Sequence, residues 1–237
     1  MVTTQTVALA TDSGRTFDAY LARPEQGRAP GIMIFTEMFG VGQHNRNMAE
    51  DFARRGFNAL IPNLFWRAAY PGELAFEGPD RDAAWARLAA FDVDAAGRDI
   101  GIAVQWLRAQ PFANGKVFAL GFCAGGRMAF VAAARANVDA AVSFYGMGIA
   151  KHVGEFGHVN CPVQLHYGLK DPHIPRPEID AVTRAAQHRP NIEIFLYAEA
   201  GHSFFNPIRP GYHAASATLA GERLDALIDR ILVAAPV

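Results

Sequence analysis

The sequence predicts an α/β fold: a mostly parallel sheet with helices on both faces and an antiparallel hairpin at the N-terminal end. Short apolar runs alternate with amphipathic helical segments along most of the chain, which is typical of layered α/β proteins. The run at residues 31–35 contains no polar side chain, as expected of a strand that is buried on both faces of a parallel sheet.

Each expected element follows from a local pattern. The first two strands, residues 2–9 and 17–22, alternate in polarity and flank the turn-forming residues 11–14, so they are expected to pair as a hairpin. Further strands are expected at 31–35, 57–61, 117–120, 140–144, 163–167 and 193–197. Helices are expected at 45–55, closed by Gly56, and at 80–91, 95–109, 128–135, 178–188 and 213–232. Residues 63–79 and 145–160 are predicted to be loops.

Composition limits the domain organisation and the partners. With 237 residues, 51% of them hydrophobic, the chain is long enough for one filled core, and we expect a single domain spanning residues 1–237. A net charge of -1 provides no basic field, so nucleic acid and anionic membranes are not expected as partners. The start has no signal-peptide pattern and no apolar run could span a bilayer, so we expect a cytoplasmic protein, a monomer, that acts on a small molecule.

The two cysteines, Cys123 and Cys161, are too few for a disulfide framework, which agrees with a reducing compartment. The eight histidines are dispersed and no metal-binding motif is present, so no metal site is expected. Cys161 directly precedes an apolar run and is predicted to be a small buried hydrophobe.

Residues 117–128 predict a sharp turn from a strand into a helix, with Cys123 at its apex. Gly121 and Gly125 stand two positions on either side, where such a turn leaves space only for small residues. The apex side chain would lie at the carboxyl edge of the sheet, beside helix N–H groups that favour an anion. A thiolate there is a strong nucleophile, although it needs a nearby cation or helix dipole to form. The alternative is a structural cysteine in a glycine-rich turn.

Asp171 and His202 each follow an expected strand. A nucleophile, then an acid, then a histidine, each at a strand end, is the chain order of α/β-hydrolase triads. His202 would carry the proton and Asp171 would orient it, while the N–H groups of Met38 and Ala124 would form the oxyanion hole. Taken singly, Asp171 could be a turn former before proline and His202 an exposed loop histidine.

Over nearly its whole length, the chain resembles the dienelactone hydrolases, a branch of the α/β-hydrolases that uses cysteine in place of serine. The resemblance is carried by residues 36–41, 121–126, 168–175 and 199–204. It implies hydrolysis of an enol-lactone, typically carboxymethylenebutenolide (dienelactone) opened to maleylacetate during the breakdown of chlorinated aromatics, without a metal or organic cofactor.

The resemblance also implies roles for single residues. Glu37 matches the acidic residue that holds the resting thiol, and because its charge opposes a second anion, we expect a largely protonated resting thiol. Arg81 matches an arginine that grips the substrate carboxylate, and Trp85 stands where the family has a pocket aromatic. Asn206 is a departure, since the family places a second arginine there, and Arg209 is the candidate to replace it.

Two other functions remain open. The missing arginine makes a broader carboxylester or thioester hydrolase credible on the same scaffold. A non-catalytic relative that binds a small ligand is the third possibility.

Overall fold

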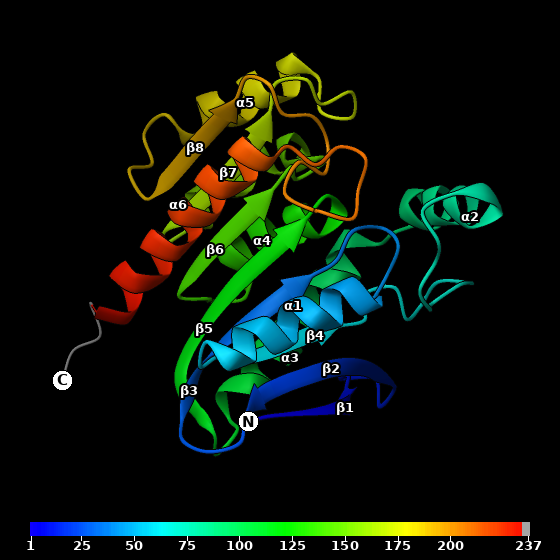
Figure 1. Cartoon of the computed structure of the whole chain (residues 1–237), viewed down its shortest axis with the longest axis vertical. Helices are drawn as coiled ribbons and strands as arrows, with labels where there is room; N and C mark the ends of the chain where they lie inside the picture. The colour runs from blue at the N-terminus through cyan, green and yellow to red at the C-terminus, as the bar shows by residue number, and fades with distance from the viewer. Residues whose placement is uncertain (234–237) are drawn as a thin grey trace. The chain divides into compact units, whose positions relative to one another are not determined.

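The computed structural model describes residues 1–233 and contains two compact units, Met1–Leu120 and Gly121–Val237 (Figure 1). Strand β5 (Ala113–Phe122) runs from the first unit into the second. Within the described residues, no helix is long and apolar enough to cross a membrane. The single domain remains a prediction, and each unit is described below by itself.

The first unit is a mixed sheet with helices on both faces. Strands β1 and β2 form the expected antiparallel hairpin, β2 pairs with β4 antiparallel, and β4 pairs with β3 parallel. Helix α1 packs against β2 and β4, and α3 packs against β1, β3 and β4, so that they lie in front of and behind the strands in Figure 1. The elements are β1 (Val2–Ala10), β2 (Thr16–Pro24), β3 (Ala29–Phe35), α1 (Gln43–Arg54), β4 (Asn58–Pro62), α2 (Gly78–Ala89) and α3 (Val93–Arg108).

Local chemistry explains where these helices begin and end. Gly56 takes a φ of 89°, a conformation that glycine adopts without strain, and it closes α1 as the sequence predicted. Asp92 caps α3, because its side-chain oxygen accepts hydrogen bonds from the N–H groups of Asp94 (3.0 Å) and Ala95 (2.9 Å). Residues 63–77 contain no helix or strand and form the predicted irregular loop.

The second unit contains parallel strands. Strands β6, β7 and β8 pair in that order and lie side by side (Figure 1). Helices α4 and α6 both pack against β6, and α6 lies in front of the strands in Figure 1. The elements are α4 (Ala124–Arg135), β6 (Ala140–Phe144), the 3₁₀ helix η1 (Ile149–His158), β7 (Val163–Gly168), α5 (Arg176–Ala186), β8 (Ile192–Tyr197) and α6 (Ala214–Val233).

Two sequence predictions in this unit were wrong in detail. Residues 145–160 were expected to be a loop, yet η1 occupies most of them, because Ile149 and Phe156 are buried and draw the segment onto the unit. Helix α4 begins at Ala124 rather than at Met128, since the glycines of the elbow are already helical. Paired glycines normally disfavour helix, so the expected helix was begun only after them.

Candidate active site

Cys123 stands at the apex of the predicted elbow. It lies between β5 and α4 with a φ of 56° and a ψ of -118°, and only 4% of its surface is exposed. A Cβ atom on Gly121 would lie 2.0 Å from the carbonyl oxygen of Gly125, so the turn excludes any side chain there. The tight, strained turn that the sequence predicted is therefore confirmed.

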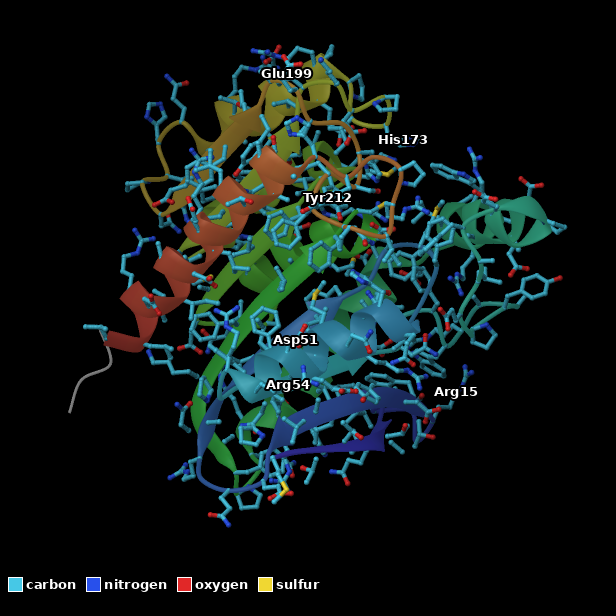
Figure 2. The ribbon with its side chains drawn as sticks, in the orientation of Figure 1. Arg15, Asp51, Arg54, His173, Glu199 and Tyr212 are labelled. Carbon is cyan, nitrogen blue, oxygen red and sulfur yellow. The ribbon has the colours of Figure 1, made fainter. Side chains whose placement is uncertain are left out.

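The loops after β7 and β8 bring Asp171 and His202 together. The Nδ1 atom of His202 lies 2.7 Å from Oδ2 of Asp171, whose carboxylate is buried. Backbone bonds join the two loops, including Lys170 N–H to Ala200 O at 2.9 Å, and an exposed ion pair links Lys170 with Glu199, which is labelled in Figure 2. The two side chains, which the sequence places after separate strands, are therefore in direct contact.

Burial and two neighbouring side chains determine the charge of His202. Burial lowers the pKa of its imidazole, but the negative charge of Cys123 and the bond to Asp171 raise it more, and the resulting pKa is about 10. The Cys123 side chain also hydrogen-bonds to His202. The imidazolium form of His202 is consequently favoured over the physiological pH range.

A second cation lies close to Cys123. Arg127, on the first turn of α4, is buried enough to lower its pKa, while the charges of Cys123 and Glu178 raise it. Glu178 also accepts a hydrogen bond from the N–H of Gly148 at 2.6 Å. On the same side, Met147 places its Sδ atom 3.5 Å from the Cys123 sulfur. Arg127 was not predicted as a site residue, although its position four residues after Cys123 puts it in the first turn of a helix.

Backbone strain is concentrated in this part of the second unit. Within residues 1–233, the non-glycine residues with positive φ are Cys123, Tyr145 (41°), Ser203 (62°) and Asn137. The first is the apex residue, the second has its ring against His202, and the third directly follows His202. Such conformations cost about 1–3 kcal/mol each and cluster at functional sites.

The side chain of Asn206 hydrogen-bonds within its own loop. The residue is buried, and its Oδ1 atom accepts a hydrogen bond from the N–H of Ile208 at 3.2 Å. Arg209 is half-buried, and its N–H donates to the carbonyl of Asn206 at 3.1 Å. The amide of Asn206 therefore shapes the turn that carries Arg209.

The first unit holds the remaining predicted residues. Glu37 and Met38 are buried on the loop after β3, as expected of an acid flanked by apolar residues. Arg81 is exposed on the first turn of α2. Trp85 is half-buried and packs against a cluster that contains Met38 and Phe39.

Arg87 is a buried residue that sequence reasoning missed. Only 4% of it is exposed, and it donates hydrogen bonds to the carbonyl oxygens of Met38 (3.1 Å), Tyr70 (2.7 Å) and Gly72 (2.8 Å). Burial lowers its pKa to about 10, so it stays charged at neutral pH. The signal available was its place on the apolar face of α2, three residues after Ala84.

Cys161 is half-buried, and burial raises the pKa of its thiol to about 11. Its thiolate is scarce at neutral pH. The prediction of a buried side chain was wrong in detail, because Cys161 is only half-buried. Within residues 1–233, no three His, Cys, Asp or Glu side chains are grouped so that they could hold a metal ion.

The chain turns sharply from a strand into a helix at a strained apex residue, and an acid and a histidine follow at the ends of two later strands. This order defines an enzyme of the α/β-hydrolase class, with cysteine at its elbow. The chain belongs to the dienelactone hydrolase family, whose sequence model matches residues 17–232. It is accordingly a hydrolase of lactones or esters.

Individual relatives agree with this assignment. A carboxymethylenebutenolidase from Pseudomonas putida is 36% identical over 223 residues, covering 93% of this chain and 94% of its own. The structure of a Klebsiella pneumoniae protein provisionally named a dienelactone hydrolase has a TM-score of 0.85 at 27% identity, covering 96% of this chain and 98% of its own. A dienelactone hydrolase-like promiscuous phosphotriesterase from metagenomic libraries has a TM-score of 0.82 at 25% identity, covering 97% and 98%.

Proposed function

We propose that this hydrolase opens an enol-lactone of the dienelactone type, carboxymethylenebutenolide to maleylacetate, through an acyl-cysteine intermediate. The observation that carries the proposal is the position of His202, which hydrogen-bonds to both Cys123 and Asp171 and has a pKa raised to about 10. The carboxymethylenebutenolidase relative supports the substrate class. In this proposal the reaction belongs to the degradation of aromatic compounds.

In the acylation step, the Cys123 thiolate attacks the lactone carbonyl and forms a carbon–sulfur bond. The tetrahedral intermediate then collapses, the ring C–O bond breaks, and the leaving enolate oxygen takes a proton from the His202 imidazolium. The product of this step is an open-chain acyl-cysteine with a free enol. Asp171 stabilises the imidazolium and fixes its Nδ1 proton throughout.

In the deacylation step, neutral His202 takes a proton from water as the water attacks the thioester. The second tetrahedral intermediate collapses, the carbon–sulfur bond breaks, and the thiolate and imidazolium are restored. The released carboxylate and the enol, which rearranges to a ketone, account for maleylacetate.

Two backbone N–H groups would hold the developing oxyanion. Ala124 begins α4, where the first N–H groups of a helix have no partner in the helix and favour negative charge. Met38 is proposed as the second donor because of its place on the loop after β3 and the family resemblance. Removing one such donor typically lowers kcat by about 10²- to 10³-fold.

Two opposite charges would set the protonation state of the resting Cys123 thiol. Glu37 opposes a second negative charge, whereas the imidazolium of His202 favours it. We expect iodoacetamide to label resting Cys123 slowly at pH 7. Labelling should be about 3- to 10-fold faster in Glu37→Gln and slower in His202→Ala, because a change of one unit in the pKa of the thiol changes the thiolate fraction about tenfold.

The control for this measurement is Glu25→Gln, which removes an exposed carboxylate of the first unit. Cys161 serves as an internal reference, because burial raises the pKa of its thiol to about 11. Rapid labelling of Cys123 that does not respond to Glu37→Gln would contradict the role given to Glu37.

Arg81 is proposed to bind the carboxylate of an anionic lactone. A charge-assisted hydrogen bond contributes about 1.5–3 kcal/mol. Arg81→Ala should therefore raise KM for the anionic lactone by about 10- to 100-fold and leave KM for a neutral aryl ester nearly unchanged. Arg98→Ala, which removes an exposed arginine of α3, is the control. An equal effect on both substrates would disprove the carboxylate contact.

A broader carboxylester or thioester hydrolase is the second candidate. It is favoured by Asn206, whose amide accepts a bond within its own turn and supplies no charge for a second carboxylate contact. Arg209, three residues on, is the proposed substitute, with Trp85 as a pocket aromatic.

The comparison of kcat/KM for dienelactone with kcat/KM for simple neutral esters tests the proposed function. A strong preference for the lactone supports it, equal or reversed values favour the broader esterase, and absence of turnover with every activated ester would leave only a ligand-binding role. We further propose that the enzyme works in the cytoplasm as a monomer on a small molecule, without cofactor, nucleic acid or membrane.

A further inference from the structure

Two aromatic rings contact the imidazole of His202 edge to face. The ring of Tyr145 lies 5.0 Å from it between centroids, at 61°, and the ring of His173 lies 4.9 Å away, at 83°. Aromatic pairs prefer such arrangements within about 4.5–7 Å. Tyr145 is completely buried and packs on Phe122 and Phe204 as well, so the core holds its ring in place.

His173 is exposed and owes its place to Asp171. Its backbone N–H donates to Oδ1 of Asp171 at 2.8 Å, while Oδ2 of the same carboxylate binds Nδ1 of His202 at 2.7 Å. The next residue, Ile174, is buried and anchors the loop. One carboxylate therefore fixes both the imidazole and the residue whose ring packs against it (His173 is labelled in Figure 2).

The hydrogen bond to Asp171, taken alone, would leave the imidazole free to rotate about the line through Nδ1 and the carboxylate oxygen. His202 must keep its Nε2 atom toward the sulfur while it gives up one proton and takes another. A ring packed against the imidazole from the solvent-exposed side restricts this rotation, as Tyr145 does from the core.

We propose that His173 is a positioning residue that uses its ring to keep the His202 imidazole oriented toward Cys123. This inference rests on the proposed function, in which His202 transfers the proton. The contact needs the shape and polarity of an aromatic ring and no charge, so phenylalanine should replace histidine at this position.

The test compares His173→Ala with His173→Phe at pH 8. In the alanine variant, kcat for an activated aryl ester should fall by about 10- to 100-fold with KM nearly unchanged, since misplacement of a reacting group by about 1 Å can cost a factor of 10². The phenylalanine variant should stay within about threefold of the wild type. His188→Ala, which removes an exposed histidine after α5, is the control.

Proton NMR of the resting protein gives a readout that does not depend on turnover. The Nδ1 proton of His202 should give a sharp downfield resonance in the wild type and in His173→Phe, and a broadened one in His173→Ala. Unchanged kcat and an unchanged resonance in His173→Ala would overturn the proposal, as would an equal loss in both variants. Failure of the proposed function would be seen instead as full activity in Cys123→Ala.

Discussion

Replacing Cys123 with alanine is expected to lower kcat by on the order of 10⁶-fold, the size of loss seen when a nucleophile is removed from a triad. The sulfur is the atom that forms the covalent bond in the proposed reaction, and within the second unit it lies beside the two cations that stabilise a thiolate, His202 and Arg127. No neighbouring group on the elbow could replace it, because the adjacent residues are Phe122 and Ala124.

The same variant should remain folded. Alanine keeps the Cβ atom and the backbone at this turn. Cys123 is only 4% exposed, so removal of its sulfur leaves a small cavity, which lowers the free energy of unfolding by about 1 kcal/mol. Steady-state kinetics on a lactone and an aryl ester, together with a thermal unfolding curve, would measure both effects. Cys161→Ala is the matched control and should keep full activity, since burial keeps that thiol protonated. Wild-type activity in Cys123→Ala would disprove the acyl-cysteine mechanism.

The elbow was predictable because its constraints are local. Gly121, Cys123 and Gly125 stand within five residues, and the clash of a Cβ on Gly121 with the carbonyl of Gly125 follows from the turn alone. The order of strands and helices was predictable for a similar reason, since each follows from a pattern of a few residues. Asp171 and His202 could be paired because strand ends on one sheet edge lie close together.

The groups around His202 could not be predicted in this way. Tyr145 and His173 are 57 and 29 residues away from His202 in sequence, and their contacts depend on how three loops pack.

Two other features were also missed. Arg87 carries a charge on an apolar helix face, where a hydrophobic side chain is expected from the sequence. Its burial is explained by hydrogen bonds to three backbone carbonyl groups, which the sequence does not reveal. The η1 helix was missed because it has only two buried side chains, Ile149 and Phe156, which are too few to define a period.

His202→Ala is expected to lower kcat by a factor comparable to Cys123→Ala, because members of such a unit do not contribute additively. Without the imidazole, the proposed proton donor to the leaving enolate and the proposed base for the attacking water are both lost. Single-turnover kinetics would separate the two steps and should find both slowed. Activity equal to that of the wild type in His202→Ala would disprove the triad.

Asp171→Asn should reduce kcat less, by about 10⁴-fold, since the amide keeps the shape of the carboxylate but not its charge. The pH profile gives the more specific test. The charges of Cys123 and Asp171 raise the pKa of His202 from 6.5 to about 10, so the imidazolium persists while the pH is below this value and is lost as the pH rises through it. Wild-type activity should accordingly decline near pH 10.

Removing the charge of Asp171 lowers the pKa of His202, and the alkaline decline should then move to lower pH in Asp171→Asn. Asp180→Asn, on α5, removes an exposed carboxylate from the same unit and should leave the profile unchanged. The measurement is kcat/KM for a neutral aryl ester between pH 6 and 11, because such a substrate does not titrate itself. If the alkaline limb stays in place in Asp171→Asn, the charge of Asp171 does not support the imidazolium, and its role is limited to holding the ring and the backbone of His173.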